Sequence, residues 1–359
     1  MKDKRYFFSV LRQIARIAIV MCSVLSVFFI ASAKSDNYQL DIITQLNLKQ
    51  GEPSSWLQLI SHPGHEQQHF VVNGAGQMYL VDGAQQPQII LDLSTQQQKT
   101  SQLLKLTALE LHPNFSLRDQ PGYGLFYTAH LEALDENMTV RRIQERGSEI
   151  PLKFDAVITE WKFNAASEQK VALNTKREVL RISVPDSTIT IKQIAFNPYI
   201  KSWNEGFGLL YVALNGGEKW NKPLYSGVVL RINPAKFGLR SYTVPTSNPY
   251  MQNSEIKDEI YLLGGQDVKQ FIWPDKSSDN ILLSHYYQSQ LLSLSDGRDD
   301  WRNSPPKAKV YQGDDVIKDV LLYRGRQLPY LRNKLLILTK NNQQWRLASL
   351  NNKRDYGRR

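Results

Sequence analysis

The sequence predicts an all-β protein and, within that class, a six-bladed β-propeller. Beyond the N-terminal segment, short apolar runs rich in Val, Ile, Leu, Tyr and Phe alternate with clusters of Gly, Pro, Asn, Asp and Ser. No long window there carries apolar residues at helical spacing. The remaining length is too great for one ordinary sandwich, whereas a propeller accommodates it by radial repetition of four-stranded blades.

Each apolar run has the length and composition of a strand, and the turn-forming residues between the runs predict reversals of the chain. In chain order the predicted strands are Phe70–Val72, Gln77–Asp82, Gln88–Leu93, Gly124–His130, Ala156–Phe163, Glu178–Ser183, Gly227–Pro234, Glu259–Gly264, Lys269–Trp273, Asn280–His285, Ala308–Gly313, Asp319–Gly325, Lys334–Thr339 and Trp345–Leu350.

An internal repeat indicates the propeller. Leu106–His130 and Ile189–Leu214 both place an apolar strand, a Pro corner, a polar loop and an aromatic-Gly-Leu strand in succession. Their prolines, Pro113 and Pro198, are about 85 residues apart, which is close to two blades of ~40–50 residues. Weaker copies at 270–285 and 321–339 follow the same order. About 325 residues divided by a blade of roughly 50 gives six or seven blades, and we predict six over residues 35–352.

Residues 1–34 are predicted to be a signal peptide. Basic residues precede the apolar run 17–33, and Ala31-Ser32-Ala33 fits a small-residue cleavage site. The alternative is an uncleaved membrane anchor, because the run lies at the short end of the ~17–25 residues that span a bilayer. We therefore expect a periplasmic or secreted protein, anchored in the membrane only if residues 17–33 remain.

The charge distribution and the cysteine content exclude some partners and some kinds of chemistry. Residues 1–34 hold six Lys or Arg and one Asp, so half of the net charge of +10 lies there. The remaining basic cluster is the tail 353–359, and no basic stripe with interleaved aromatics is present, so nucleic acid is not an expected partner. Cys22 is the single cysteine and lies in the apolar run, which excludes thiolate chemistry and Cys-based zinc sites from the mature chain.

An ordered set of motifs resembles one family. These motifs are Phe70–Asp82, Ile89–Ser94, Leu106–Phe115, Glu178–Pro198, Leu209–Gly217, Ser226–Pro234, Val244–Tyr250, Glu259–Gly265 and Tyr323–Leu338. Together they resemble the glucose/sorbosone dehydrogenase family, six-bladed propellers that include soluble sugar dehydrogenases using pyrroloquinoline quinone (PQQ) and calcium. The resemblance covers nearly all of the mature chain and implies quinone-dependent sugar oxidation, in which a histidine takes a proton and an arginine polarises the quinone.

The resemblance also implies that the chemical positions have changed. The family's proton-accepting histidine falls on Ile189, and two neighbouring glycines fall on Ile191 and Lys192. The family's arginine falls on Gln266, and its later acidic stretch corresponds to 284–290, which contains no carboxylate. Because isoleucine cannot accept a proton, we expect weak or absent catalysis, and PQQ and calcium are implied by the resemblance alone.

Several residues remain candidates for cofactor or ligand binding, each with a structural alternative. By resemblance, Gly216, Gly217 and Arg231 match family positions, but glycine turns and an arginine on an apolar strand are also ordinary structural devices. Lys269, Arg324 and Arg326 could line the central funnel and attract an anion, or could be solvated loop charges. Trp220 could stack on a sugar or pack in a loop.

The histidines do not form a convincing metal site in sequence. His62, His65 and His69 fall within eight residues, but Pro63 and Gly64 place the first two in a loop, so no metal site is predicted. His112 and His130 are expected to have structural roles, which leaves His285 as a candidate for a displaced base.

The sequence supports two main hypotheses about function, an enzyme and a non-catalytic binding protein. The first is an exported sugar oxidoreductase dependent on PQQ and calcium, impaired at Ile189 and Gln266. The second is a non-catalytic propeller that binds a glycan, a small ligand or a cell-envelope protein. A relocated active site with different chemistry is a third hypothesis.

Overall fold

The computed structural model describes residues 56–350, apart from gaps at 84–85, 97–100, 135–140, 146–147, 165–166, 217–224, 226, 277–279, 287, 303, 327 and 342–343. The predicted signal peptide and the basic tail lie outside these residues, so both stay predictions. Helical structure in the described part consists of three short 3-10 turns, Leu93–Gln96, Leu173–Thr175 and Pro329–Leu331. None of the helices described there has the length and apolar character needed to cross a bilayer.

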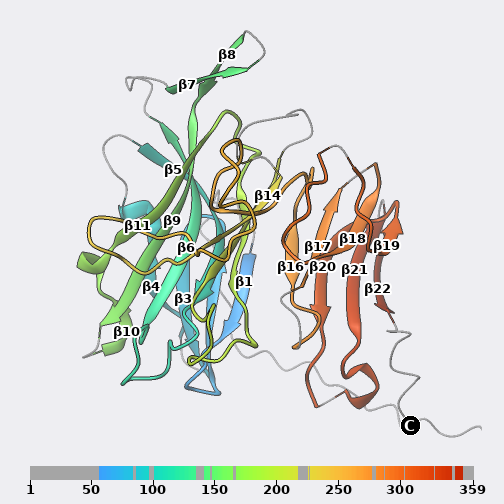
Figure 1. Ribbon diagram of the computed structural model, residues 1–359. Helices are drawn as coiled ribbons and strands as arrows, with labels where there is room; N and C mark the ends of the chain where they lie inside the picture. The colour runs from blue at the N-terminus through green and yellow to red at the C-terminus, as the bar shows by residue number, and fades with distance from the viewer. Residues whose placement is uncertain are drawn as a thin grey trace, which may run out of the picture. The chain divides into compact units, whose positions relative to one another are not determined.

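The described strands form an all-β propeller whose blades are antiparallel sheets (Figure 1). Blade 1 contains β1 (Trp56–Ser61), β2 (Gln68–Asn73), β3 (Gln77–Asp82) and β4 (Gln88–Asp92). Blade 2 contains β5 (Ser101–Leu111), β6 (Leu125–Leu134) and β9 (Phe154–Asn164), with β10 (Ser167–Val171) and β11 (Arg177–Val184) on the outer edge of β9.

The remaining blades follow in chain order. Blade 3 contains β12 (Ile191–Phe196), β13 (Leu210–Leu214), β14 (Val228–Ile232) and β15 (Ile260–Leu262). Blade 4 contains β16 (Gln270–Ile272), β17 (Ile281–Tyr286), β18 (Gln290–Ser295) and β19 (Lys309–Gly313). Blade 5 contains β20 (Val316–Leu322), β21 (Leu335–Asn341) and β22 (Gln344–Leu350). Every run predicted as a strand overlaps an observed strand, which confirms the all-β prediction.

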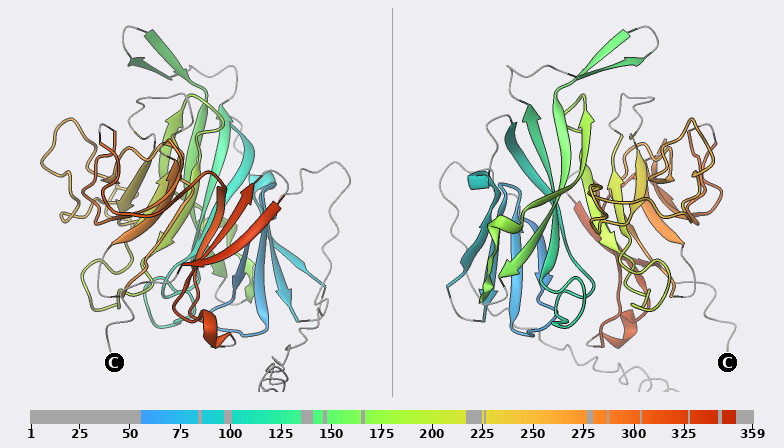
Figure 2. Two further views of the ribbon diagram at one scale, coloured as in Figure 1. Left: turned by 90° about the vertical axis from the view of Figure 1, so that its right-hand side faces the viewer. Right: turned by 60° about the vertical axis from the view of Figure 1, so that its left-hand side comes forward.

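Residues 56–350 form five blades where six were predicted, and blade 2 explains the difference. The two repeated segments are β5–β6 and β12–β13, the first two strands of consecutive blades. Their separation is therefore one blade and not two, because blade 2 is lengthened by the hairpin of β7 (Arg141–Glu145) and β8 (Ser148–Leu152) and by the extra strand on β9. The hairpin projects beyond β5, β6 and β9 in every view (Figures 1 and 2).

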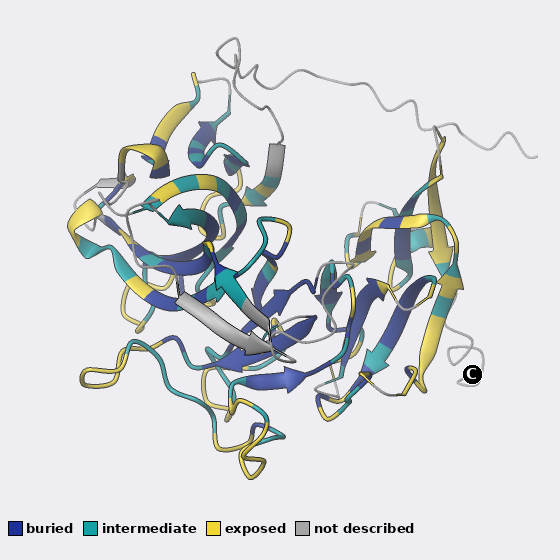
Figure 3. Cartoon of the chain, turned by 90° about the horizontal axis from the view of Figure 1, so that it is seen from above, coloured by how far each residue is buried: buried dark blue, intermediate teal, exposed yellow. Residues whose placement is uncertain are grey.

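Apolar side chains from facing blades form one buried cluster at each junction between consecutive blades. Phe70 and Trp161 belong to the cluster between blades 1 and 2, and Ile194 and Leu230 to the cluster between blades 2 and 3. Two further clusters join blade 3 to blade 4 and blade 4 to blade 5. Most buried residues lie in strands and most exposed ones in connections (Figure 3), as expected when both faces of a blade are covered by neighbours.

The first strands of the blades, β1, β5, β12, β16 and β20, are the inner strands, and each lies beside the next. Long polar side chains bridge them. Gln58 on β1 accepts a hydrogen bond from the Leu109 amide on β5, at 3.2 Å. Gln193 on β12 accepts from the Phe271 amide at 2.7 Å and donates to the Phe271 carbonyl at 3.1 Å.

Two further bridges complete the series. Gln270 on β16 donates to the Val320 carbonyl on β20 at 2.8 Å. Between β5 and β12 the bridging side chain is Glu110, whose carboxyl group bonds the Phe196 backbone. Side-chain amides or a carboxyl therefore join each described inner strand to the next, which satisfies backbone groups that the sheets leave unpaired.

Candidate functional site

Four lysines gather in the first part of the inner strands. Lys105 lies on β5, Lys192 on β12, Lys318 on β20, and Lys269 directly precedes β16. Because these strands are neighbours and the lysines influence one another electrostatically, they form one group, here named the lysine cluster. Only Lys269 was identified from sequence.

Hydrogen bonds hold two of these ammonium groups. The Lys105 Nζ donates to the Ser187 carbonyl at 3.2 Å, in the turn that leads into β12. The Lys269 Nζ donates to the Gln290 Oε1 at 2.8 Å and lies 3.6 Å from the Asp267 Oδ2. These contacts fix the heads of Lys105 and Lys269 near the beginnings of their strands.

The lysine cluster carries more positive than negative charge. Burial lowers the pKa of Lys192, the charges of Lys105 and Lys269 lower it further, and Asp267 opposes them. Burial likewise lowers the pKa of Lys269, where Asp267 acts against the charge of Lys318. An anion placed among these groups would favour their charged forms, so the site has the electrostatics of an anion-binding centre.

The positions singled out by resemblance lie beside this cluster. Ile189 lies two residues before β12, the first strand of blade 3. The backbone amide of its neighbour, Thr190, donates a hydrogen bond to the Asn215 Oδ1 at 2.7 Å. The Gly216 amide then donates to the Gln266 carbonyl at 2.9 Å. The chain thus brings Ile189, Gly216 and Gln266 into one neighbourhood, next in sequence to Lys192 and Asp267.

The side chain at the histidine position is enclosed. Ile189 is 1% exposed and belongs to the apolar cluster between blades 2 and 3. Gln266 is exposed, and its role in the fold comes from its carbonyl, which accepts from Gly216. Gly217 and Trp220 lie outside the described residues, so their proposed roles stay predictions.

Arg231 lies apart from the lysine cluster, on the third strand of blade 3. Its Nε donates to the Asn248 Oδ1 at 2.7 Å, and its guanidinium also bonds the Ser247 carbonyl at 2.7 Å. The guanidinium lies 4.7 Å from the centre of the Tyr261 ring. These contacts anchor the long connection between β14 and β15, consistent with the structural alternative.

Arg324 and Arg326 follow the end of β20, whereas the lysine cluster lies at the beginnings of the inner strands. The Arg324 guanidinium donates to the Asn333 Oδ1 at 2.7 Å and to the Tyr199 hydroxyl at 3.2 Å. Tyr199 follows the end of β12, so these residues belong to the other end of the inner strands. Arg326 is exposed. The sequence grouped Lys269 with Arg324 and Arg326, and the structure separates them.

The histidines are distributed among separate environments. His62 and His65 lie in the β1–β2 loop with ring centres 4.7 Å apart, while His69 is on β2. His285 is 0% exposed, 2.9 Å from the Ser293 Oγ through its Nε2, and stacked on Trp301. Burial lowers its pKa to about 4, so it is a neutral core residue at pH 7. Within the described ranges, no group of three or more His, Cys, Asp or Glu is placed to hold a metal ion.

The missed lysines do have a sequence signal. Each follows an aliphatic residue in, or just before, its inner strand, as Leu104-Lys105, Ile191-Lys192, Val268-Lys269 and Ile317-Lys318. One such pair means little, but its recurrence in four successive repeats places four charges at one end of the inner strands.

The fold resembles that of known dehydrogenases. A solved structure named glucose dehydrogenase aligns over 84% of this chain and 86% of its own, with a TM-score of 0.53 and 14% identity. A Thermus thermophilus protein titled as an oxidoreductase (glucose dehydrogenase) aligns over 84% of each chain, with a TM-score of 0.52 and 17% identity. A third glucose dehydrogenase structure covers 83% of this chain and 90% of its own, with a TM-score of 0.51 and 13% identity. No protein-family model and no curated protein matches the sequence. At these identities the similarity establishes a shared all-β propeller fold.

Proposed function

We propose that this chain is an exported binding protein that uses a dehydrogenase-like propeller to hold a small anionic ligand at the lysine cluster, without oxidising a sugar. The observation that carries the proposal is the convergence of Lys105, Lys192, Lys269 and Lys318 on neighbouring inner strands, with Asp267 as their acidic partner. Clustered charges of one sign raise the local concentration of the opposite ion, and Lys192 and Lys318 are exposed to solvent.

Two observations support a binding role over catalysis. The position that resembles the family's proton acceptor is Ile189, which is enclosed in the core and has no group that accepts a proton. The corresponding arginine position is Gln266, which supplies no charge to a quinone carbonyl. Because general acid–base catalysis contributes ~10²–10⁴ in rate, its loss would leave little turnover.

The lysine cluster fits part of the implied cofactor. PQQ carries carboxylates, which ammonium groups would bind, and when bound it supplies a quinone that accepts hydride. Calcium needs six to eight oxygen ligands, and no described group of three or more His, Cys, Asp or Glu is arranged for a metal. The residues present therefore suit an anion better than the complete pair of cofactors.

The second candidate is a PQQ-dependent sugar oxidoreductase with reduced activity, favoured by the similarity to glucose dehydrogenase structures. Purified protein mixed with calcium and PQQ would be assayed with aldoses and an artificial electron acceptor. Sustained reduction of the acceptor, dependent on both PQQ and aldose, would establish this candidate and overturn the proposal of a non-catalytic protein.

The anion proposal is tested by calorimetric titration with citrate, glucuronate and inorganic phosphate, with glucose as the neutral probe. At least one anion should bind, more weakly at higher salt, and Lys192→Met should weaken it about tenfold or more. Lys201→Met is the matched control, because Lys201 is an exposed lysine in the loop after β12. Absence of binding by all three anions, or equal affinity in both variants, would refute the assignment.

Export rests on the N-terminal pattern alone. Fractionation of cells expressing the full chain, with mass determination of the product, tests it: we expect a periplasmic or secreted protein lacking about the first 33 residues. Recovery of the uncleaved chain in the membrane fraction would instead support an anchor at 17–33. A cell-envelope protein or a glycan is also a proposed partner. The anions that bind in the titration would indicate which acidic groups such a partner carries.

A further inference from the structure

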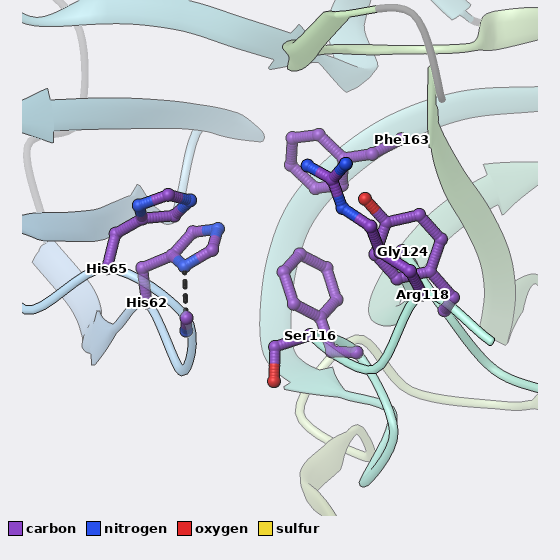
Figure 4. A pocket seen from close by; sticks show the side chains of 9 residues that line it. His62, His65, Ser116, Arg118, Gly124 and Phe163 are labelled. Atoms are coloured by element: carbon purple, nitrogen blue, oxygen red, sulfur yellow. Dashed lines mark hydrogen bonds between the residues drawn. The ribbon is translucent and has the colours of Figure 1, made fainter. Parts of the chain in front are cut away.

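A cavity of about 240 Å³ lies between blades 1 and 2 (Figure 4). It is formed by the β1–β2 loop, the β5–β6 loop and the end of β9. These loops follow the ends of β1 and β5, and Lys105 precedes the end of β5 at Leu111 by six residues, or about 20 Å of extended strand. The cavity is therefore a separate site. Its lining residues are His62, Gly64, His65, Phe115, Ser116, Arg118, Tyr123, Gly124 and Phe163.

The apolar wall of this cavity is formed by packed aromatic rings. The rings of Phe115 and Phe163 meet edge to face, with centres 5.4 Å apart, and both residues are buried. Phe70 packs behind them, 6.0 Å from Phe115 and 5.7 Å from Phe163. Backbone bonds tie the wall together, since the Gly124 amide donates to the Phe115 carbonyl and the Phe163 amide to the Gly124 carbonyl, both at 2.9 Å. A flat ring entering the cavity would meet aromatic surface that is already in place.

Two of the polar side chains that line the cavity, His62 and Arg118, offer hydrogen-bond donors. The Gly64 amide donates to the His62 Nδ1 at 3.1 Å, so the neutral His62 ring carries its proton on Nε2. Arg118 has donors only and a permanent positive charge. His62 and His65 lie on one side, and Arg118 with Phe163 lies on the other (Figure 4). No Asp, Glu, Asn or Gln side chain is among the lining residues.

We propose that this cavity binds a small aromatic carboxylate, with its ring against Phe115 and Phe163 and its carboxylate toward Arg118. A dry cavity of ~150 Å³ holds benzene, so about 240 Å³ accommodates one ring and a carboxylate. A planar carboxylate also matches the paired donors of a guanidinium. A neutral sugar fits less well, because its hydroxyls need acceptors as well as donors, and Ser116 and Tyr123 are the lining side chains that offer hydroxyl acceptors.

The test is ligand-observed NMR and calorimetry on the purified protein, with benzoate as the probe and benzyl alcohol and glucose as neutral comparisons. For a ligand of this size we expect a Kd of about 1 mM for benzoate, and binding by benzyl alcohol at least tenfold weaker. Saturable benzoate binding that survives Lys192→Met would also separate this site from the lysine cluster, so the two proposals can fail independently.

Two variants locate the site. Arg118→Met keeps most of the side-chain length, removes the charge and should weaken benzoate binding at least tenfold, while Ser116→Phe should fill the cavity and abolish it. Arg240→Met is the matched control, because it removes the same charge from an exposed arginine in the β14–β15 connection. Thermal melting confirms that each variant is folded. The proposal is overturned by no benzoate binding up to about 10 mM, by equal binding of benzyl alcohol, by preferential binding of glucose, or by unchanged binding in Arg118→Met.

Discussion

Glu110 provides a direct test of how the inner strands are joined. Its carboxyl group bonds the Phe196 backbone on β12, where the other joints use Gln58, Gln193 and Gln270. Burial raises the pKa of Glu110 to about 8, although the Phe196 bond acts in the opposite direction. The carboxyl is then mostly protonated at pH 7. Glu110→Gln should therefore preserve the joint and remove only the cost of ionisation.

The size of the effect follows from the pKa difference. An ordinary glutamate has a pKa of 4.5 and Glu110 one of about 8, and each unit corresponds to about 1.4 kcal/mol. The stability that protonation provides is complete below pH 4.5 and is lost as the pH rises to 8, with a ceiling of about 5 kcal/mol. Because the Glu110 residue retains some solvent exposure, we expect roughly half of that ceiling.

Urea unfolding at a series of pH values measures this difference. The wild type and Glu110→Gln should have similar free energies of unfolding near pH 4, and the variant should be more stable by about 2–3 kcal/mol at pH 8.5. Glu205→Gln is the control, because Glu205 is exposed and should show no such trend. A stability difference that does not change between pH 4.5 and 8 would refute the assignment of a buried, protonated bridge.

Two further predictions concern buried polar contacts. Gln193→Leu leaves the Phe271 amide and carbonyl without their bridge and should lower the free energy of unfolding by about 1–3 kcal/mol, measured by urea denaturation; an unchanged midpoint would contradict the role of the bridge. Arg181→Met removes ion pairs of 2.7 Å to Asp155 and 2.9 Å to Glu132 and should cost about 3–5 kcal/mol at pH 7. Burial raises the pKa of Glu132, but hydrogen bonds from His130 and Arg181 outweigh burial and lower it to about 2. The contribution of the Glu132–Arg181 ion pair to stability is therefore present above pH 4.5 and is lost as the pH falls toward 2. A pH-independent cost between pH 7 and 2 would argue against it.

The strands could be predicted from sequence because the preference of β-branched and aromatic residues for strands, and of Gly, Pro, Asn and Asp for turns, depends on residues that are close in sequence. The number of blades could not, because it depends on which strands share a sheet. The β7–β8 hairpin lengthens blade 2, and only strand pairing shows that β5–β6 and β12–β13 begin consecutive blades.

The candidate site was predicted in part. Ile189, Gly216 and Gln266, which the resemblance singled out, lie near one another, because the segments before β12 and β16 and the segment after β13 meet at one end of the sheets. The sequence also offered Arg231, by resemblance, and Arg324, as a charge near the last blade. Those residues lie on a third strand and beyond the opposite end of an inner strand, which are positions that a local motif does not specify.

The bridges between inner strands have a consequence for how such a protein could change in blade number. Each bridge reaches backbone atoms, and every residue except proline offers the same backbone atoms, so a bridge does not depend on which blade follows it. Excision or duplication of a whole blade would leave Gln193 facing another inner strand with an equivalent amide and carbonyl. The polar joint is thus interchangeable between blades, whereas the apolar clusters at the junctions are specific to the blades that they join.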